Sequence, residues 1–301
     1  MPSMKDIRKK VSSTKNTQQI TKAMKMVSAA KLRRAQNAII NARPYAYKLH
    51  SVISRLAMSG EFNHPLMAQI PEPKKLLLVV CTSDRGLCGA FNGGVIKFTE
   101  KFYRENKSKY EVINFIFVGK KGAEYFKKRD VRTVETMINL VNEIRYELAA
   151  KLADRLMNEF TAGGYDEVIL VYNEFKSAIS QKVVAEKLLP IQPLNKEETI
   201  NAEEEDIKES INAFAGSNYI FEPEAEVILR QLLPKHFAIQ TYRCMLESIA
   251  GEHGARMTAM DSATRNAGQM IKRLTLTYNK LRQAAITKEL VEIVSGAEAL
   301  K

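Results

Sequence analysis

The segment from residue 83 to residue 94 comes closest, of any in this sequence, to a site for chemistry. It reads SDRGLCGAFNGG and follows a continuous apolar run of strand length. Glycines after a buried strand can bring backbone N–H groups close to a phosphate. The spacing fails, however, because no glycine lies between Gly86 and Gly89, and no Lys and Ser or Thr follow the last glycine. The sequence therefore predicts a tight strand-to-helix turn with Asp84 and Arg85 paired locally.

Other residue types that carry catalysis are scattered along the chain. None of the four histidines belongs to an H-E-x-x-H motif or lies near a C-x-x-C motif, and no G-x-S-x-G motif is present. The three cysteines, Cys81, Cys88 and Cys244, form no disulfide framework and fit a reducing compartment. We therefore expect no catalytic residue, no metal site and no cofactor, and the chain is predicted not to be an enzyme by itself.

Positive charge is concentrated at the N-terminal end. The net charge is +12, and residues 1–50 hold twelve Lys or Arg against one acid, Asp6. So lopsided a segment indicates a surface for an acidic partner, either nucleic acid or protein, although a solvated coiled-coil face is also charged. Residues 195–209 are acidic, with seven acids and two lysines, and are expected to be an exposed loop or short helix.

In the middle of the chain, apolar runs alternate with helical patterns. Runs typical of strands buried on both faces are Lys75–Thr82, Val112–Val118 and Glu167–Tyr172. Helical segments are expected at Gly93–Glu105, Lys121–Lys128 and within Asn139–Phe160, whereas Ser177–Leu189 is compatible with strand or helix. Strand–helix–strand alternation predicts a Rossmann-like α/β domain with a mainly parallel sheet, over residues 74–222.

The two ends of the chain have helical patterns that are too long for a compact domain. Residues 1–57 predict one helix, with a capping box of Ser3 and Asp6 and with Pro44 kinking it rather than ending it. Residues 223–301 predict the other, so each helix would be roughly 75–90 Å long at about 1.5 Å per residue. No run of eighteen apolar residues suggests a membrane span. The predicted fold class is α/β, with a long antiparallel coiled coil of the N- and C-terminal helices and the domain inserted between them.

Apolar and small residues at helical spacing predict where these two helices meet. On the first helix the expected positions include Ile7, Val11, Ile20, Met24, Val27, Ala35, Ile39, Ala42, Leu49, Ile53 and Leu56. On the second they are Ala263, Ala267, Met270, Leu274, Tyr278, Leu281 and Ala285. The second stripe is narrow and rich in alanine, which favours close packing of one helix on another.

Four stretches of the sequence carry a resemblance to a known family. They are Asn16–Ala30 (NTQQITKAMKMVSAA), Ser83–Asn92 (SDRGLCGAFN), Ala255–Ala267 (ARMTAMDSATRNA) and Leu276–Leu300 (LTYNKLRQAAITKELVEIVSGAEAL). Through them, and over its whole length, the chain resembles the gamma subunit of the F-type ATP synthase. A basic coiled coil that binds nucleic acid would explain the charge of the first helix, but neither the narrow C-terminal stripe nor these motifs. We therefore expect no nucleic-acid partner.

The resemblance implies a function, partners and a location. The paired helices would rotate in a hexamer of alpha and beta subunits and couple ion flow through the c ring to ATP synthesis or hydrolysis at beta-subunit sites. The inserted domain, with the epsilon subunit, would dock on the ring of c subunits. Because the sequence begins with no transit peptide, the resemblance implies a bacterial complex at the cell inner membrane. There the chain would be peripheral, on the cytoplasmic side, and held to the membrane only through the complex.

The resemblance also implies contact residues. Arg282 and Gln283 match a pair that contacts a beta-subunit loop, and Met24, Lys25 and Arg256 match further positions that face beta. From the residues alone, Met24 is equally well explained as part of the helix seam. Tyr219 and Glu222 match the segment near the c ring. No cysteine lies between Cys88 and Cys244, so the thiol switch of chloroplast relatives is not expected.

Overall fold

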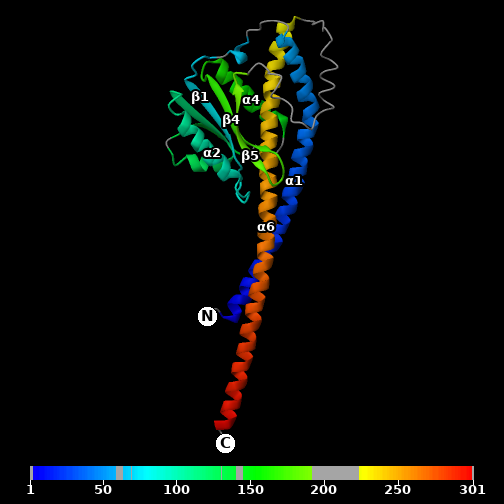
Figure 1. Cartoon of the computed structure of the whole chain (residues 1–301), viewed down its shortest axis with the longest axis vertical. Coiled ribbons are helices and arrows are strands. Elements are labelled where there is room, and N and C mark those ends of the chain that lie inside the picture. Colours follow the sequence, from blue (N-terminus) through cyan, green and yellow to red (C-terminus); the bar gives the residue numbers. More distant parts are fainter. Residues whose placement is uncertain are drawn as a thin grey trace.

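Two long helices dominate the computed structural model, which describes residues 3–58, 64–68, 70–129, 131–139, 145–191 and 224–299. Helix α1 runs from Met4 to Met58 and helix α6 from Ala225 to Ala299, and they lie side by side in opposite directions (Figure 1). At about 1.5 Å per residue, α1 is about 83 Å long, as expected, whereas α6 at about 113 Å exceeds the 75–90 Å predicted. The paired helices are called the shaft below.

Local chemistry at the start of α1 agrees with the sequence. The Ser3 backbone N–H donates to Asp6 Oδ2 at 3.2 Å, and the Asp6 N–H donates to Ser3 Oγ at 3.2 Å, which is the reciprocal capping box. Pro44 lies inside the helix and does not end it, as predicted. Pro234 lies inside α6 in the same way.

An α/β domain packs against one side of the shaft. Its five strands lie in the order β3-β2-β1-β4-β5, and all neighbours are parallel except β4 and β5. The strands are β1 Lys75–Cys81, β2 Val112–Val118, β3 Arg132–Met137, β4 Glu167–Phe175 and β5 Gln181–Leu189. The helical elements are η1 Pro65–Met67, α2 Phe91–Asn106, α3 Lys120–Phe126 and α4 Tyr146–Thr161. The predicted Rossmann-like domain with a mainly parallel sheet is confirmed.

Two strands differ from the sequence expectation in an informative way. The ambiguous segment 177–189 supplies β5, which pairs antiparallel with β4 through a short turn. The strand β3 was not predicted, because it lies at the sheet edge and its side chains are mostly exposed. An edge strand needs no continuous apolar run, which is the signal that identified the three central strands.

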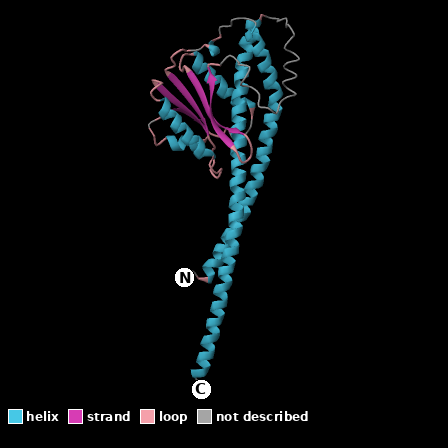
Figure 2. Cartoon of the chain, in the orientation of Figure 1, coloured by secondary structure: helices cyan, strands magenta, loops and turns pink. Residues whose placement is uncertain are grey.

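The sheet is covered on both faces, as Figure 2 shows. On one face, Leu76, Leu78 and Val80 of β1 pack with side chains of α2 and α3. On the other, Leu77 and Val79 pack with α4 and with the N-terminal part of α6. The first quarter of α6 is therefore both a shaft helix and a layer of the domain core.

Candidate functional site

Hydrogen bonds that involve side chains hold the turn after β1 in place, and the turn is not shaped as a cradle for a ligand. Asn92 Oδ1 accepts from the Ser83 N–H at 2.9 Å, and Ser83 Oγ donates to the Arg85 carbonyl at 2.6 Å. Asp84 accepts from the backbone N–H groups of Lys120 at 3.1 Å and Asn139 at 3.0 Å. The tight turn is confirmed, but the predicted pairing of Asp84 with Arg85 is wrong, because the carboxylate instead accepts from backbone N–H groups at the start of α3 and just after β3.

Carbonyl groups of this turn point at α6. The guanidinium of Arg256 donates to the Arg85 carbonyl at 3.2 Å and to the Gly86 carbonyl at 3.3 Å. Arg256 is itself paired with Glu252 at 2.5 Å and is only 9% exposed. A phosphate site would present N–H groups rather than carbonyls. The turn is therefore built to dock on α6, and Leu87 at its tip is left 63% exposed, with φ 65°.

The seam between α1 and α6 is narrow and partly polar. Thr264 and Thr21 have hydroxyl oxygens 2.8 Å apart, and Gln18 Nε2 lies 3.5 Å from the Thr264 carbonyl. Lys25 Nζ forms an ion pair with Asp261 at 2.6 Å. Polar groups thus occupy positions at which an apolar seam was expected.

The register of the seam corrects three expectations. Ile20 is 59% exposed and Val27 is 57% exposed, so neither lies in the seam. On α6, Met270 is 55% exposed, and the adjacent Ile271 is more covered. Most covered positions of α1 instead follow steps of four and three, which is the heptad spacing, and further half-buried positions, 24, 29, 31, 36 and 38, flank this line. The positions in the heptad spacing are residues 7, 11, 14, 18, 21, 25, 28, 32, 35, 39, 42, 46, 49 and 53. That spacing, followed regardless of polarity, would have identified the seam from the sequence.

The resulting surface is basic and apolar together. Ile20, Met26 and Val27 project outward from the helix that holds most of the positive charge, and Met26 is 59% exposed. Large exposed apolar side chains on a charged helix are typical of a surface that a protein partner covers. Sequence reasoning missed these residues because it assigned apolar side chains to the seam.

Helix α6 extends beyond the start of α1. The pairs Thr14 with Met270 and Lys25 with Asp261 set the antiparallel register, so the first turn of α1 lies level with residues near 280 of α6. The remaining turns project alone, as Figure 1 shows. This overhang, residues 282–299, has large exposed apolar side chains that share one broad face of the helix at 3.6 residues per turn: Ile286 49%, Leu290 57%, Val291 58%, Ile293 68% and Val294 61%.

The sequence-derived contact residues lie in different settings. Arg282 and Gln283 are exposed at the start of the overhang. Met24 and Lys25 are half-buried near the middle of α1, and Lys25 is paired within the chain. Arg256 is buried against the turn after β1. Tyr219 and Glu222 lie outside the described residues, as does the acidic segment 195–209. Their roles at partner surfaces stay predictions.

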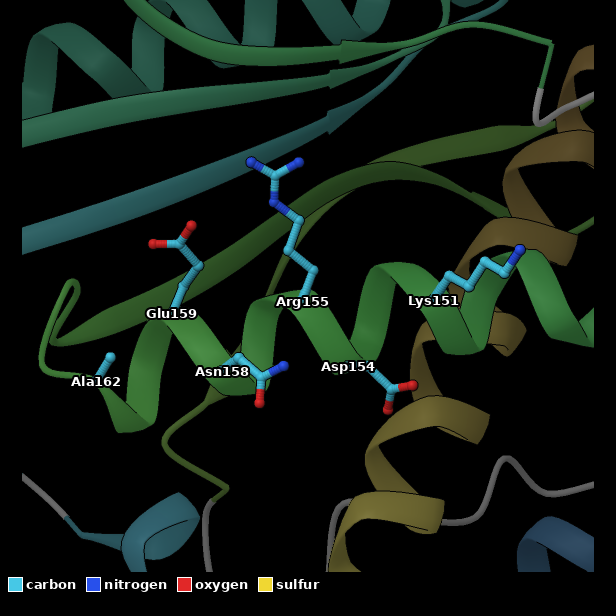
Figure 3. A pocket seen from close by; sticks show the side chains of 6 residues that line it. All are labelled: Lys151, Asp154, Arg155, Asn158, Glu159 and Ala162. Atoms are coloured by element: carbon cyan, nitrogen blue, oxygen red, sulfur yellow. The ribbon is translucent and has the colours of Figure 1, made fainter.

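A groove along α4 offers no convergent site. It encloses about 510 Å³ and is lined by Lys151, Asp154, Arg155, Asn158, Glu159 and Ala162. In Figure 3, Arg155 and Glu159 project from one side of the helix, whereas Asp154 and Asn158 project from the other. Arg155 is also paired with Glu135 of β3. Because its polar groups diverge, the groove has no obvious chemical centre.

Among the described residues, no helix has the length and apolar character needed to cross a membrane. The same residues include no group of three or more His, Cys, Asp or Glu placed to hold a metal ion.

These features define a class: a coiled-coil stalk protein with an α/β domain beside the shaft and a single helix projecting at the far end. A family model described as ATP synthase matches residues 3–300. The ATP synthase gamma chain of Bdellovibrio bacteriovorus is 56% identical, and that of Geobacter metallireducens 50% identical, over the full length of both proteins in each case. The chain therefore belongs to the ATP synthase gamma chain family.

Solved structures agree with this assignment. A chain of the Tetrahymena thermophila mitochondrial ATP synthase central stalk and c ring has TM-score 0.59 and 27% identity, covering 81% of this chain and 99% of its own. A chain of the Euglena gracilis mitochondrial ATP synthase has TM-score 0.67, covering 99% of this chain and 94% of its own. Its 24% identity supports the fold alone.

Proposed function

We propose that this chain is the central-stalk rotor of an F-type ATP synthase and turns inside a hexamer of alpha and beta subunits. The overhang of α6 is the observation that carries this proposal. A single helix with a broad face of exposed apolar side chains is costly in water and needs a partner that covers this face. A ring of subunits with a central cavity supplies such an environment.

The opposite end of the rotor would meet the membrane part of the complex. The Tetrahymena thermophila relative comes from an assembly described as central stalk and c ring. We propose the c ring and the epsilon subunit as partners of this end, with Tyr219 and Glu222 at the ring. The chain would then be peripheral, on the cytoplasmic side of a bacterial inner membrane, and bound there only through the complex.

The rotor would perform no chemistry itself. Beta-subunit sites would make or hydrolyse ATP, and an asymmetric rotor would bias each beta subunit toward one of its conformations in turn, because it makes different contacts with each. Arg282 and Gln283 would contact beta at the overhang, and Met24 and Lys25 would do so at mid-shaft. Arg256 would act through the turn that it holds, because it is only 9% exposed.

A rotation assay tests this proposal directly. The three native cysteines are buried, so a single exposed cysteine introduced by Lys128→Cys in the α/β domain can carry a bead. The chain is co-expressed with bacterial alpha and beta subunits. The purified complex is then fixed to a surface through its alpha and beta subunits. ATP should drive rotation of the bead.

The matched control is the chain without the introduced cysteine, which should carry no bead. Elution of the chain separately from an intact alpha and beta assembly would contradict the proposal. Bead-labelled complexes that hydrolyse ATP with a stationary bead would contradict it as well.

A further inference from the structure

Ionisable side chains cluster where the α/β domain meets α6. Glu186 of β5 accepts from Tyr172 Oη of β4 at 2.7 Å and from Arg243 Nη2 of α6 at 2.6 Å. One helical turn further along α6, Glu247 Oε1 lies 3.4 Å from Arg243 Nη1. The Cys244 thiol lies 3.5 Å from Glu186 Oε2. The Arg243 guanidinium therefore joins the shaft helix to Glu186 of β5 and, through that carboxylate, to Tyr172 of β4.

Two carboxylates share that single cation. The side chain of Glu247 is 14% exposed, and its Oε2 atom is buried with no hydrogen-bond partner among the described residues. The carboxylate of Glu174 of β4 also repels that of Glu247, and Lys176, whose charge partly offsets this, is already paired with Glu174 at 2.6 Å. A buried, under-paired carboxylate is costly, and binding a proton removes that cost.

The surroundings of Glu247 favour its neutral form. Burial raises the pKa of Glu247 to about 7, and although Arg243 opposes this, Glu186 adds to it. Burial also raises the pKa of Tyr172 and of Cys244, so both stay protonated near neutral pH. The next part of α6 meets α1 through apolar side chains of the cluster around Leu32, Ala35 and Ile249. Glu247 is thus the group in this cluster that titrates near neutrality.

We propose that the Glu186–Arg243–Glu247 cluster is a proton-sensitive latch that holds the α/β domain to the shaft most tightly when Glu247 carries a proton. When the domain separates from α6, Glu247 enters water and its pKa returns to the ordinary, lower value. The docked state therefore binds more protons than the open state between those two values. Docking is strongest at the acidic end of that range and weakens as the pH rises through neutrality.

Hydrogen exchange of the full chain tests this latch with the variant Glu247→Gln, which is neutral at every pH. Amides of β5 and of residues 243–247 report opening of the domain from α6, once exchange is corrected for its intrinsic pH dependence. From pH 6 to pH 8, protection in the wild type relative to Glu247→Gln should fall about tenfold, from a pKa near 7 when docked and near 4.5 when open. The comparison must be relative, because the nearby His253 titrates in the opposite sense.

The matched control is Glu226→Gln, which removes an exposed carboxylate paired with Arg230 on the same helix. It should keep the wild-type pH profile. An unchanged ratio of wild type to Glu247→Gln from pH 6 to pH 8 would overturn the latch, as would an equal effect of Glu226→Gln.

A measurement on the wild type covers the case in which Glu247→Gln does not fold. Carbon-13 NMR of glutamate-labelled chain should show a carboxyl that titrates near pH 7 and that persists in Glu252→Gln, because burial raises the pKa of Glu252 as well. Titration of every glutamate below about pH 5 would overturn the proposal.

Discussion

The two ends of α6 differ in how much of their apolar side chains the rest of the protein covers. Near the α/β domain, Leu229, Leu233 and Phe237 are at most 1% exposed, because the sheet and α4 enclose them. Toward the C-terminus, Leu276 is 63% exposed and Ile293 is 68% exposed. The first region is fixed by the protein's own core, whereas the second leaves large apolar side chains for something else to cover.

This contrast shows how one helix can serve as anchor and as contact surface. Burial of apolar area stabilises the domain end at about 25 cal/mol per Å². The C-terminal end of α6 lies beside α1 alone or projects by itself, so its side chains do not have to pack into a hydrophobic core. Substitutions should therefore affect folding at one end and assembly or turnover at the other.

The largest effect on folding is expected from Phe237→Ala. The side chain is 1% exposed in the core between the sheet and α6, and its removal should lower the free energy of unfolding by about 3–5 kcal/mol. Leu276→Ala, in the exposed half, is the control and should change it by less than about 0.5 kcal/mol. Urea unfolding of the full chain, followed by circular dichroism, measures both. Equal losses would remove the contrast between the two ends.

Acid should weaken the domain end through His253. Burial lowers the pKa of this histidine to about 4, with Arg256 and Lys31 adding to the effect. The unfolded chain binds the proton at higher pH than the folded chain, so stability is lost as the pH falls from about 6.5 to 4. His253→Gln should lose roughly 3 kcal/mol less than wild type between pH 7 and pH 4. Urea unfolding at the two pH values checks this, and parallel losses in both proteins would contradict it.

A smaller effect is expected in the polar seam. Thr21 is 8% exposed, and its hydroxyl oxygen lies 2.8 Å from that of Thr264 across the shaft. Thr21→Val should remove the hydrogen bond across the shaft and cost about 1 kcal/mol of unfolding free energy, although the Thr264 hydroxyl keeps the Met260 carbonyl as a partner at 2.7 Å. The double variant with Thr264→Val should recover part of that loss, because both polar groups are then gone. Strictly additive losses in thermal unfolding would show that the two hydroxyls do not interact.

The smallest effect on stability is expected at the overhang. Replacing Arg282 and Gln283 with alanine should change the free energy of unfolding by less than about 0.5 kcal/mol, since both side chains are exposed. In the assembled complex the same double variant should slow ATP turnover. Lys272→Ala, also exposed but on the paired part of α6, is the control. Unchanged turnover with normal assembly would remove Arg282 and Gln283 from the proposed beta contact.

The sequence predicted the fold where a single physical signal dominates. Continuous apolar runs identified β1, β2 and β4, because strands buried on both faces need such side chains. The capping box and the long helices followed from local chemistry in the same way. The edge strand β3 lacks that signal. Segment 177–189 forms a strand rather than a helix because it pairs with β4, and this pairing is not visible in its own sequence pattern.

The prediction of the seam residues failed because the seam contains polar as well as apolar side chains. Apolar side-chain type predicts Met270 rather than Ile271, and Ile20 and Val27, as seam residues, whereas the spacing of the covered positions excludes all three. A slim shaft tolerates threonine and glutamine between its helices, so side-chain type is a poor guide there. The docking of Arg256 on the turn after β1 depends on residues far apart in sequence, and no local pattern encodes it.

The heptad spacing that runs along the seam of α1 has a mechanical consequence. Helices held together by a seven-residue repeat wind around each other as a left-handed supercoil. Torque of one sense tightens such a winding and presses the helices together, whereas the opposite sense unwinds it and pulls the seam apart. A rotor built this way has different torsional stiffness in its two directions of rotation.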